Sequence, residues 1–172
     1  EGENMKKIVI RARDCTGCRV CESTCALYNE KVNDLTRSRV QVVKNPNLGL
    51  NKPVLCYQCT SPPCVDPCPV DAIKRDEESG VVRIDYDLCI GCELCAAECP
   101  FSAIITLPDR VIKCELCDGD PQCVKYCETR AIEYVDPRVA YERQRGRSAQ
   151  PVLARLKADL GLPAEHPVVS RR

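Results

Sequence analysis

The chain has 172 residues with 25 basic and 25 acidic side chains, so its formal net charge is zero, and 16 of its residues are cysteine. Aromatic residues make up only 4% of the chain, with one Phe and no Trp, so the large side chains that fill an ordinary core are scarce. A chain this poor in core material is usually stabilised by disulfides or by metal sites. No apolar run approaches the length of a membrane span.

A secreted disulfide scaffold is the first interpretation that an even number of cysteines raises. Such a protein needs a signal peptide, and the short segment 6–10 is followed at once by Arg11, Arg13 and Asp14, which leaves no apolar run of the required length. No twin-arginine leader is present either. We therefore expect a cytoplasmic protein in a reducing compartment, where clustered cysteines indicate metal ligands.

Short strands are predicted at regular places along the chain. Val and Ile residues indicate strands at 8–10, 81–84 and 111–112, and the alternating run 39–43 indicates another. Three Ala-Ile pairs recur at one offset from a preceding cysteine, and they are Ala72-Ile73, Ala103-Ile104 and Ala131-Ile132. The repeating unit is therefore a strand, a cysteine loop, a helical turn and a second short strand.

The cysteines form four groups of one design. Each group opens with two cysteines three residues apart and closes with two that are four apart, and only the middle gap varies. The groups are Cys15, Cys18, Cys21 and Cys25; Cys56, Cys59, Cys64 and Cys68; Cys89, Cys92, Cys95 and Cys99; and Cys114, Cys117, Cys123 and Cys127.

This spacing is typical of [4Fe–4S] clusters. Three thiolates on a tight loop can bind three irons of one cubane, and in the bacterial ferredoxin run the fourth cysteine binds the other cluster of a pair. Zinc ribbons and thioredoxin-type sites also use C-x-x-C, but a zinc ribbon separates its two pairs by a longer loop and a redox pair needs only one copy. Sixteen cysteines thus predict four [4Fe–4S] clusters, and a metal-stabilised chain that is largely unfolded without iron.

With its four groups in this order, the chain resembles the four-cluster ferredoxin-type electron-transfer subunits of molybdenum and tungsten oxidoreductases, hydrogenases and carbon monoxide dehydrogenases. The resemblance covers about residues 6–135. The short fourth group, KCELCDGDPQCVKYC, is closest to the small subunits of tungsten aldehyde oxidoreductases, hydrogenases and carbon monoxide dehydrogenases. Subunits of the dimethyl sulfoxide reductase and formate dehydrogenase kind carry a longer insertion there. Ala26 and Glu128 depart from the family, which often has proline at both positions.

The resemblance implies an α+β fold, a doubled bacterial ferredoxin in which the cluster pairs are nested. Residues 1–53 with 105–137 would form the outer pair, and 54–104 the inner pair. The implied ligand sets are Cys56, Cys59, Cys64 and Cys99; Cys89, Cys92, Cys95 and Cys68; Cys15, Cys18, Cys21 and Cys127; and Cys114, Cys117, Cys123 and Cys25. Proline follows the last cysteine only in the second and third groups, at Pro69 and Pro100, which favours pairing these two groups. Sequential pairing, first with second and third with fourth, stays open.

The segment 138–172 is a basic tail, with eight Lys or Arg against three Asp or Glu. The run 143–148 is linker-like, and Val152, Leu153, Leu156 and Leu160 then follow helical spacing, which predicts a short amphipathic helix. This helix either packs back on its own body or docks on another subunit. His166 is given no role. Arg19, Lys113 and Lys125 lie close to ligands in the sequence. One interpretation is that they raise individual cluster potentials, but exposed surface charge is the more common explanation, and we expect it here.

We therefore expect a non-catalytic relay in an oxidoreductase complex of anaerobic metabolism. Its partners would be a large tungsten- or molybdenum-pterin catalytic subunit, such as aldehyde oxidoreductase, and a flavin or other redox subunit or further copies of this chain. Nucleic acid is not expected, because four clusters add about −8 to the body. The alternatives are a free polyferredoxin, or the electron-transfer subunit of a hydrogenase, formate dehydrogenase or carbon monoxide dehydrogenase. A catalytic iron–sulfur enzyme would need an open iron, and no phosphate loop or general-base constellation stands beside the cysteines.

Overall fold

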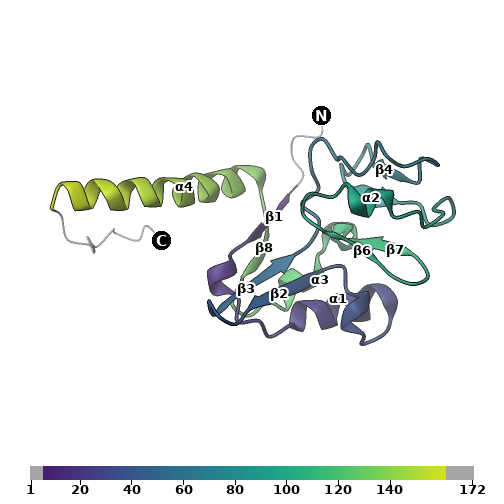
Figure 1. Cartoon of the computed structure of the whole chain (residues 1–172), viewed down its shortest axis with the longest axis horizontal. Helices are drawn as coiled ribbons and strands as arrows, with labels where there is room; N and C mark the ends of the chain where they lie inside the picture. The colour runs from purple at the N-terminus through teal and green to yellow at the C-terminus, as the bar shows by residue number, and fades with distance from the viewer. Residues whose placement is uncertain (1–5, 162–172) are drawn as a thin grey trace.

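The computed structural model describes residues 6–161, which form a body of short strands and helices and one long helix that leaves it (Figure 1). The strands are β1 (Lys7–Ile10), β2 (Gln41–Asn45), β3 (Leu50–Val54), β4 (Ile73–Arg75), β5 (Val82–Ile84), β6 (Ile104–Thr106), β7 (Val111–Lys113) and β8 (Ile132–Val135). The helices are α1 (Val20–Glu30), α2 (Leu94–Ala97), α3 (Gln122–Lys125) and α4 (Pro137–Asp159), with 3-10 turns at Ala12–Asp14, Leu35–Arg37 and Leu116–Gly119. The α+β class is confirmed.

Three antiparallel hairpins connect one cysteine group to the next. Strands β2 and β3 lie between the first and second groups, β4 and β5 between the second and third, and β6 and β7 between the third and fourth. Gly80, with a φ of 67°, stands at the turn before β5, in the left-handed region that a residue without Cβ adopts most easily. Each hairpin therefore reverses the chain direction between one cysteine group and the next.

The fourth strand pair joins segments from opposite ends of the body. Strand β1 pairs antiparallel with β8, from Lys7 opposite Val135 to Ile10 opposite Ile132. Helices α1 and α3, which carry cysteines of the first and fourth groups, pack against each other. The first and fourth groups therefore lie side by side although about a hundred residues separate them (Figure 1).

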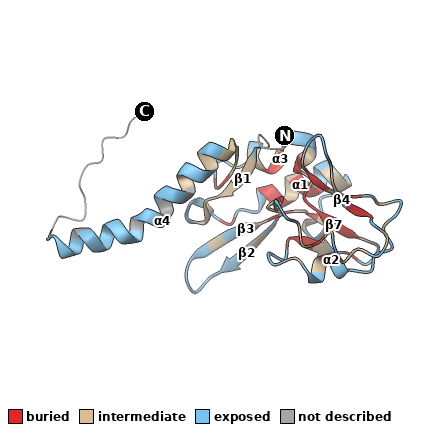
Figure 2. Ribbon diagram, turned by 90° about the horizontal axis from the view of Figure 1, so that it is seen from above, coloured by how far each residue is buried: buried red, intermediate tan, exposed pale blue. Residues whose placement is uncertain are grey.

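The buried residues lie within the body (Figure 2). They form two clusters, and cysteines belong to both. One cluster combines Leu55, Leu116 and Ile132 with cysteines of the first and fourth groups. The other combines Ile73 and Val82, among other residues, with cysteines of the second and third groups. Since apolar side chains share each core with thiols, the packing of the body depends on what those thiols bind.

Most predicted strands occur within a residue or two of their expected places. The segments 8–10, 81–84 and 111–112 correspond to β1, β5 and β7, and the run 39–43 begins β2 at Gln41. The isoleucine of each Ala-Ile pair is the first residue of β4, β6 or β8, and the alanines before them are buried.

Helix α4 differs from the prediction in length. It is continuous from Pro137 to Asp159, so the linker expected at 143–148 is wrong. The Asp136 side chain accepts a hydrogen bond from the Arg138 amide, and proline stands at the first helical position, two features that favour a helix start here. Pro151 lies inside the helix. The side chains of Val152, Leu153, Leu156 and Leu160 are exposed, and His166 lies outside the described residues.

Within 6–161 no helix combines the length and apolar character needed to cross a membrane.

Candidate metal centres

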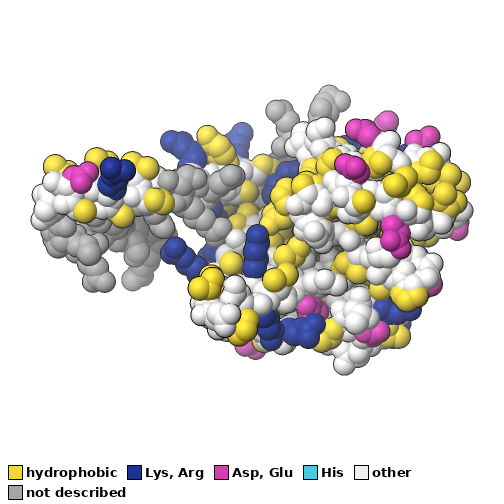
Figure 3. Space-filling view, in the orientation of Figure 1, with side chains coloured by type: hydrophobic (Ala, Val, Ile, Leu, Met, Phe, Trp, Pro, Cys, Tyr) yellow, Lys and Arg dark blue, Asp and Glu magenta, His cyan; other side chains and the backbone are white. Residues whose placement is uncertain are grey.

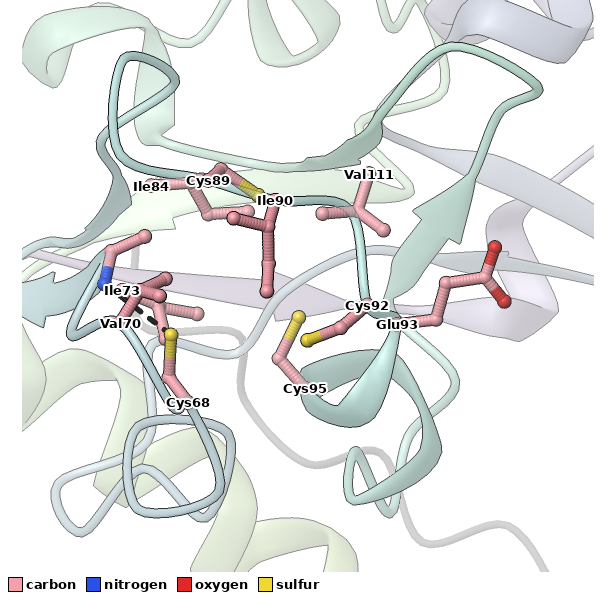
Figure 4. Close-up of a pocket in the computed structure, with 11 residues that line it drawn as sticks. Cys68, Val70, Ile73, Ile84, Cys89, Ile90, Cys92, Glu93, Cys95 and Val111 are labelled. Atoms are coloured by element: carbon pink, nitrogen blue, oxygen red, sulfur yellow. Dashed lines mark hydrogen bonds between the residues drawn. The ribbon is translucent and has the colours of Figure 1, made fainter.

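One pocket is lined by Cys89, Cys92 and Cys95 of the third group together with Cys68 of the second. Figure 4 shows the sulfur atoms of Cys68, Cys92 and Cys95 projecting into the same space. Its apolar wall is supplied by strand ends and by the cysteine loop, through Ile73, Ile84, Ile90 and Val111. A negatively charged group held here would be shielded from water on its inner side.

A second pocket exchanges the roles of the same two groups. Cys56, Cys59 and Cys64 of the second group meet Cys99 of the third. Its wall includes the Phe101 ring, which packs against Tyr57 with 4.7 Å between ring centroids. The second and third groups are thus brought together as a reciprocal pair.

A third pocket takes its cysteines from the two groups that are farthest apart in the sequence. Cys114, Cys117 and Cys123 of the fourth group meet Cys25 of the first. Cys117 has a φ of 47°, a left-handed conformation that turns the loop sharply between Cys114 and Cys123.

The remaining four cysteines are Cys15, Cys18, Cys21 and Cys127. Cys18 and Cys127 lie close enough to Cys21 to act on its thiol electrostatically. Cys18 is exposed and Cys15 is half-buried, so this quartet is more open to solvent than the four cysteines of the third pocket. The first and fourth groups are thus also neighbours, so among the described residues the first group lies beside the fourth and the second beside the third.

Backbone amides donate to several of the cysteine sulfurs. The Ala72 amide lies 3.3 Å from Cys68 Sγ, and the Ala103 amide lies 3.4 Å from Cys99 Sγ. The first group has no Ala-Ile pair, and there the Arg39 amide reaches Cys25 Sγ at 3.3 Å. Such donors favour the charged thiolate over the thiol, so they stabilise a sulfur in the form that binds metal. Hydrogen bonds to the sulfurs also help to set the reduction potential of a bound cluster. At Cys68 burial raises the pKa, but the amide donors outweigh it and the pKa is lowered.

Burial dominates at the inner cysteines. It raises the pKa of Cys21 and of Cys114 to about 12 and that of Cys64 to about 11. In the metal-free chain these thiols are therefore protonated at neutral pH. Metal ions that bind them must displace the protons, so metal binding and proton release are linked.

The arrangement of the donors fits a cluster better than a single ion. Within 6–161 no three His, Cys, Asp or Glu side chains come close enough to hold one metal ion. Zinc–sulfur bonds of about 2.3 Å would draw four sulfurs to within roughly 3.8 Å of one another. A cubane places iron and sulfide between its thiolates, so its ligands surround a larger space, as the cysteines do around each of the three pockets.

Two buried polar residues near the cysteines were not singled out by the sequence pattern. Gln58 lies inside a C-x-x-C loop, and Glu22 follows a ligand-type cysteine; both are buried. Lys113 was expected to be exposed and is fully buried, which corrects that prediction. The side chains of Arg19 and Lys125 are 44% and 51% exposed, as expected. Polar residues beside a cysteine carry no sequence signal that separates a buried position from an exposed one.

Comparison with known proteins gives a consistent result. Residues 49–137 match the family described as the 4Fe-4S dicluster domain. An uncharacterised ferredoxin of Methanocaldococcus jannaschii is 40% identical over 77% of this chain and 74% of its own length. The polyferredoxin-like subunit of the aliphatic sulfonate oxidoreductase of Pyrococcus furiosus is 38% identical over 70% of each chain. The thiosulfate reductase electron transfer subunit PhsB of Salmonella typhi is 31% identical over 83% of this chain and 88% of its own length.

Removal of the metal should unfold the body, because cysteines occupy both buried clusters and apolar side chains alone are too few to hold them together. Treatment with an iron chelator and a reductant, without oxygen, should abolish most of the far-ultraviolet circular dichroism that the body contributes. The control is protein treated with the chelator under conditions that leave the clusters intact. An unchanged spectrum after complete iron loss would contradict this view of the core.

Proposed function

Since this chain belongs to the 4Fe-4S dicluster domain family, we propose that it holds four [4Fe–4S] clusters in nested pairs and relays electrons between a catalytic subunit and a second redox partner. It is a ferredoxin-type electron-transfer protein, as its relatives are. The observation that carries the proposal is the grouping of the cysteines, three from one group with one from another, around each of three pockets.

The proposed ligand sets pair the second group with the third and the first with the fourth. Residues 54–104 would hold the inner pair of clusters, and residues 1–53 with 105–137 the outer pair, as in a doubled bacterial ferredoxin. The pairing of β1 with β8 supports the outer pair, because it brings the first and fourth groups together. The sets are Cys68, Cys89, Cys92 and Cys95; Cys56, Cys59, Cys64 and Cys99; Cys25, Cys114, Cys117 and Cys123; and Cys15, Cys18, Cys21 and Cys127.

These sets follow one another through the body in a single order. The pocket of Cys68 and that of Cys99 share one buried cluster of residues. The Gln58 side chain, from the loop of Cys56 and Cys59, donates to the Cys114 carbonyl at 2.8 Å and so connects the next two sets. The last two sets are connected by α1, which carries Cys21 and Cys25 one turn apart. The order therefore runs from the set of Cys68 to the set of Cys15.

Such an order suits electron relay. Each cluster supplies one-electron reduction and oxidation when bound. The chain's contribution is to exclude water with the apolar walls, to hold the sulfurs with amide donors, and to keep neighbouring sets close. All sixteen cysteines are used by four complete sets, which leaves no open iron for a substrate.

The proposed catalytic partner is a large tungsten- or molybdenum-pterin subunit, such as an aldehyde oxidoreductase. Relatives named as subunits of a sulfonate oxidoreductase and a thiosulfate reductase support a place in an oxidoreductase complex. A flavin or other redox subunit, or a second copy of this chain, would meet the opposite end. The second candidate function is a free polyferredoxin, and the long exposed helix α4 favours the complex over it.

Helix α4 is proposed as the arm that docks on the catalytic subunit. It projects from the body and exposes Val152, Leu153, Leu156 and Leu160, so it does not pack back on the body in this region (Figures 1 and 2). Lys and Arg side chains gather where the helix leaves the body, whereas Asp and Glu side chains lie over the part that holds β4 and α2 (Figure 3). A groove between β1 and α4 is lined by Lys7, Arg13 and Lys52, among other residues. An acidic surface with an apolar strip would complement this region.

The cluster count tests the proposal directly. Protein prepared without oxygen should contain about 16 iron and about 16 acid-labile sulfide per chain, with negligible zinc. Iron by plasma mass spectrometry and sulfide by colorimetry check this. About eight iron in fully reconstituted, folded protein, or stoichiometric zinc, would overturn the four-cluster assignment.

Nested pairing predicts which thiols a single substitution releases. Cys25→Ala should remove about four iron and expose Cys114, Cys117 and Cys123 to alkylation, because these thiols would share its cluster. Peptide mass spectrometry after brief treatment with iodoacetamide reads the released thiols. Cys68→Ala is the matched substitution, and it should release Cys89, Cys92 and Cys95. Release of Cys56, Cys59 and Cys64 by Cys25→Ala would show sequential pairing.

Deletion of residues 138–172 should leave the iron content near its original value and weaken association with the catalytic subunit, since the body holds all the cysteines. The measurement is tungsten or molybdenum that co-purifies per tagged chain from its own cells, at low and high salt. Leu153→Ser with Leu156→Ser, which keeps the tail, should reproduce much of the loss. Unchanged metal content in the truncated complex would show that α4 is no docking arm, and loss of self-association alone would assign it to contacts between copies.

A further inference from the structure

Lys113 is a fully buried lysine between two of the cysteine sets. It is the last residue of β7, its relative exposure is 0%, and Cys114 follows it. The ammonium Nζ donates to the carbonyl oxygens of Val82 and of Cys114, the latter at 3.0 Å. Val82 lines the pocket of Cys56, Cys59, Cys64 and Cys99, whereas Cys114 belongs to the set completed by Cys25. The positive charge therefore lies between the two middle sets of the proposed order.

No carboxylate in the described chain pairs with this ammonium, whose hydrogen bonds go to two carbonyl groups. A buried charge without a counter-charge is costly, and carbonyl dipoles offset only part of that cost. Glu22, the buried acid beside Cys21, is different, because Arg19 pairs with it. Negative clusters on both sides would provide the missing counter-charge for Lys113.

Gln58 holds the same two residues together. Its Nε2 donates to the Cys114 carbonyl at 2.8 Å, and its Oε1 accepts from the Val82 amide at 2.9 Å. Lys113 and Gln58 thus bridge the same pair of residues, each with its side chain buried. The ammonium is fixed in place, so its effect on neighbouring charges is not averaged by motion or screened by water.

We propose that Lys113 is a redox-tuning residue, whose fixed positive charge raises the reduction potentials of the two middle clusters above the values they would have without it. Reduction adds one negative charge to a cluster, and a nearby cation favours that charge. Because Lys113 lies between the two sets, one residue would act on both, and the terminal sets of Cys68 and of Cys15 would be affected less. This inference rests on the four-cluster assignment proposed above.

The test is a redox titration of the anoxic holoprotein, followed by electron paramagnetic resonance, for the wild type and for Lys113→Met, Lys113→Gln and Lys113→Arg. In Lys113→Met two of the four clusters should become at least tenfold harder to reduce at a given potential, a fall in midpoint potential of about 59 mV for a one-electron couple. Lys113→Gln should act in the same direction, and Lys113→Arg should stay near the wild type.

Lys125→Met is the matched control. Lys125 also stands between two ligand-type cysteines in the sequence, but it is exposed and pairs with Asp120. Its removal should leave all four potentials nearly unchanged, because solvent screens an exposed charge.

Iron content, measured first, separates the two proposals. Wild-type protein with fewer than four clusters contradicts the cluster assignment, whatever the potentials are. With four clusters present, unchanged potentials in Lys113→Met, or equal shifts in all four, would overturn the tuning role. Loss of iron from both neutral variants while Lys113→Arg retains it would also overturn that role, since the cation would then be a requirement for cluster assembly.

Discussion

The structure depends on one constraint, that thiols from separate cysteine groups must converge on the same buried space. Three thiols of a set can come from one loop, but the fourth comes from another group, as Cys25 does for the set of Cys114. This requirement explains the pairing of β1 with β8 and the packing of α1 on α3, which join segments separated by about a hundred residues or more. Loop closure over that distance has an entropic cost that scarce apolar contacts offset poorly, so we expect bound metal to supply much of the free energy of folding.

The hairpins and the sulfur environment are parts of the same unit. The alanine amide before β4 donates to Cys68, and the one before β6 donates to Cys99, so the offset between cysteine and Ala-Ile pair positions a hydrogen-bond donor. The isoleucine that follows begins a strand and is buried in the core. Two adjacent residues thus connect the charge on a sulfur to the packing of the strand pair. A substitution at the alanine would affect both at once.

Much of the fold and of the candidate metal centres could be predicted from the sequence, because metal-ligand spacing and β-branched runs are local signals. The four cysteine groups and the strands β1, β5 and β7 were found from the sequence for that reason. The length of α4 was not, because its polar segment 143–148 resembles a linker and its helix start depends on Asp136 and Pro137. The burial of Lys113 was not predictable either, since it follows from the approach of β5 to β7 and from the position of Gln58.

The buried ammonium also connects the redox properties to folding. In the metal-free chain Lys113 would lack a counter-charge, and its burial would then oppose the folded state. Burial raises the pKa of Cys64 to about 11 and that of Cys114 to about 12, so in the metal-free chain these two thiols stay protonated and provide no negative charge to balance Lys113. When thiolates bind iron, the same residues change from a cost to a favourable charge pair. The arrangement that raises a cluster potential therefore also makes the folded body selective for the metal-bound state.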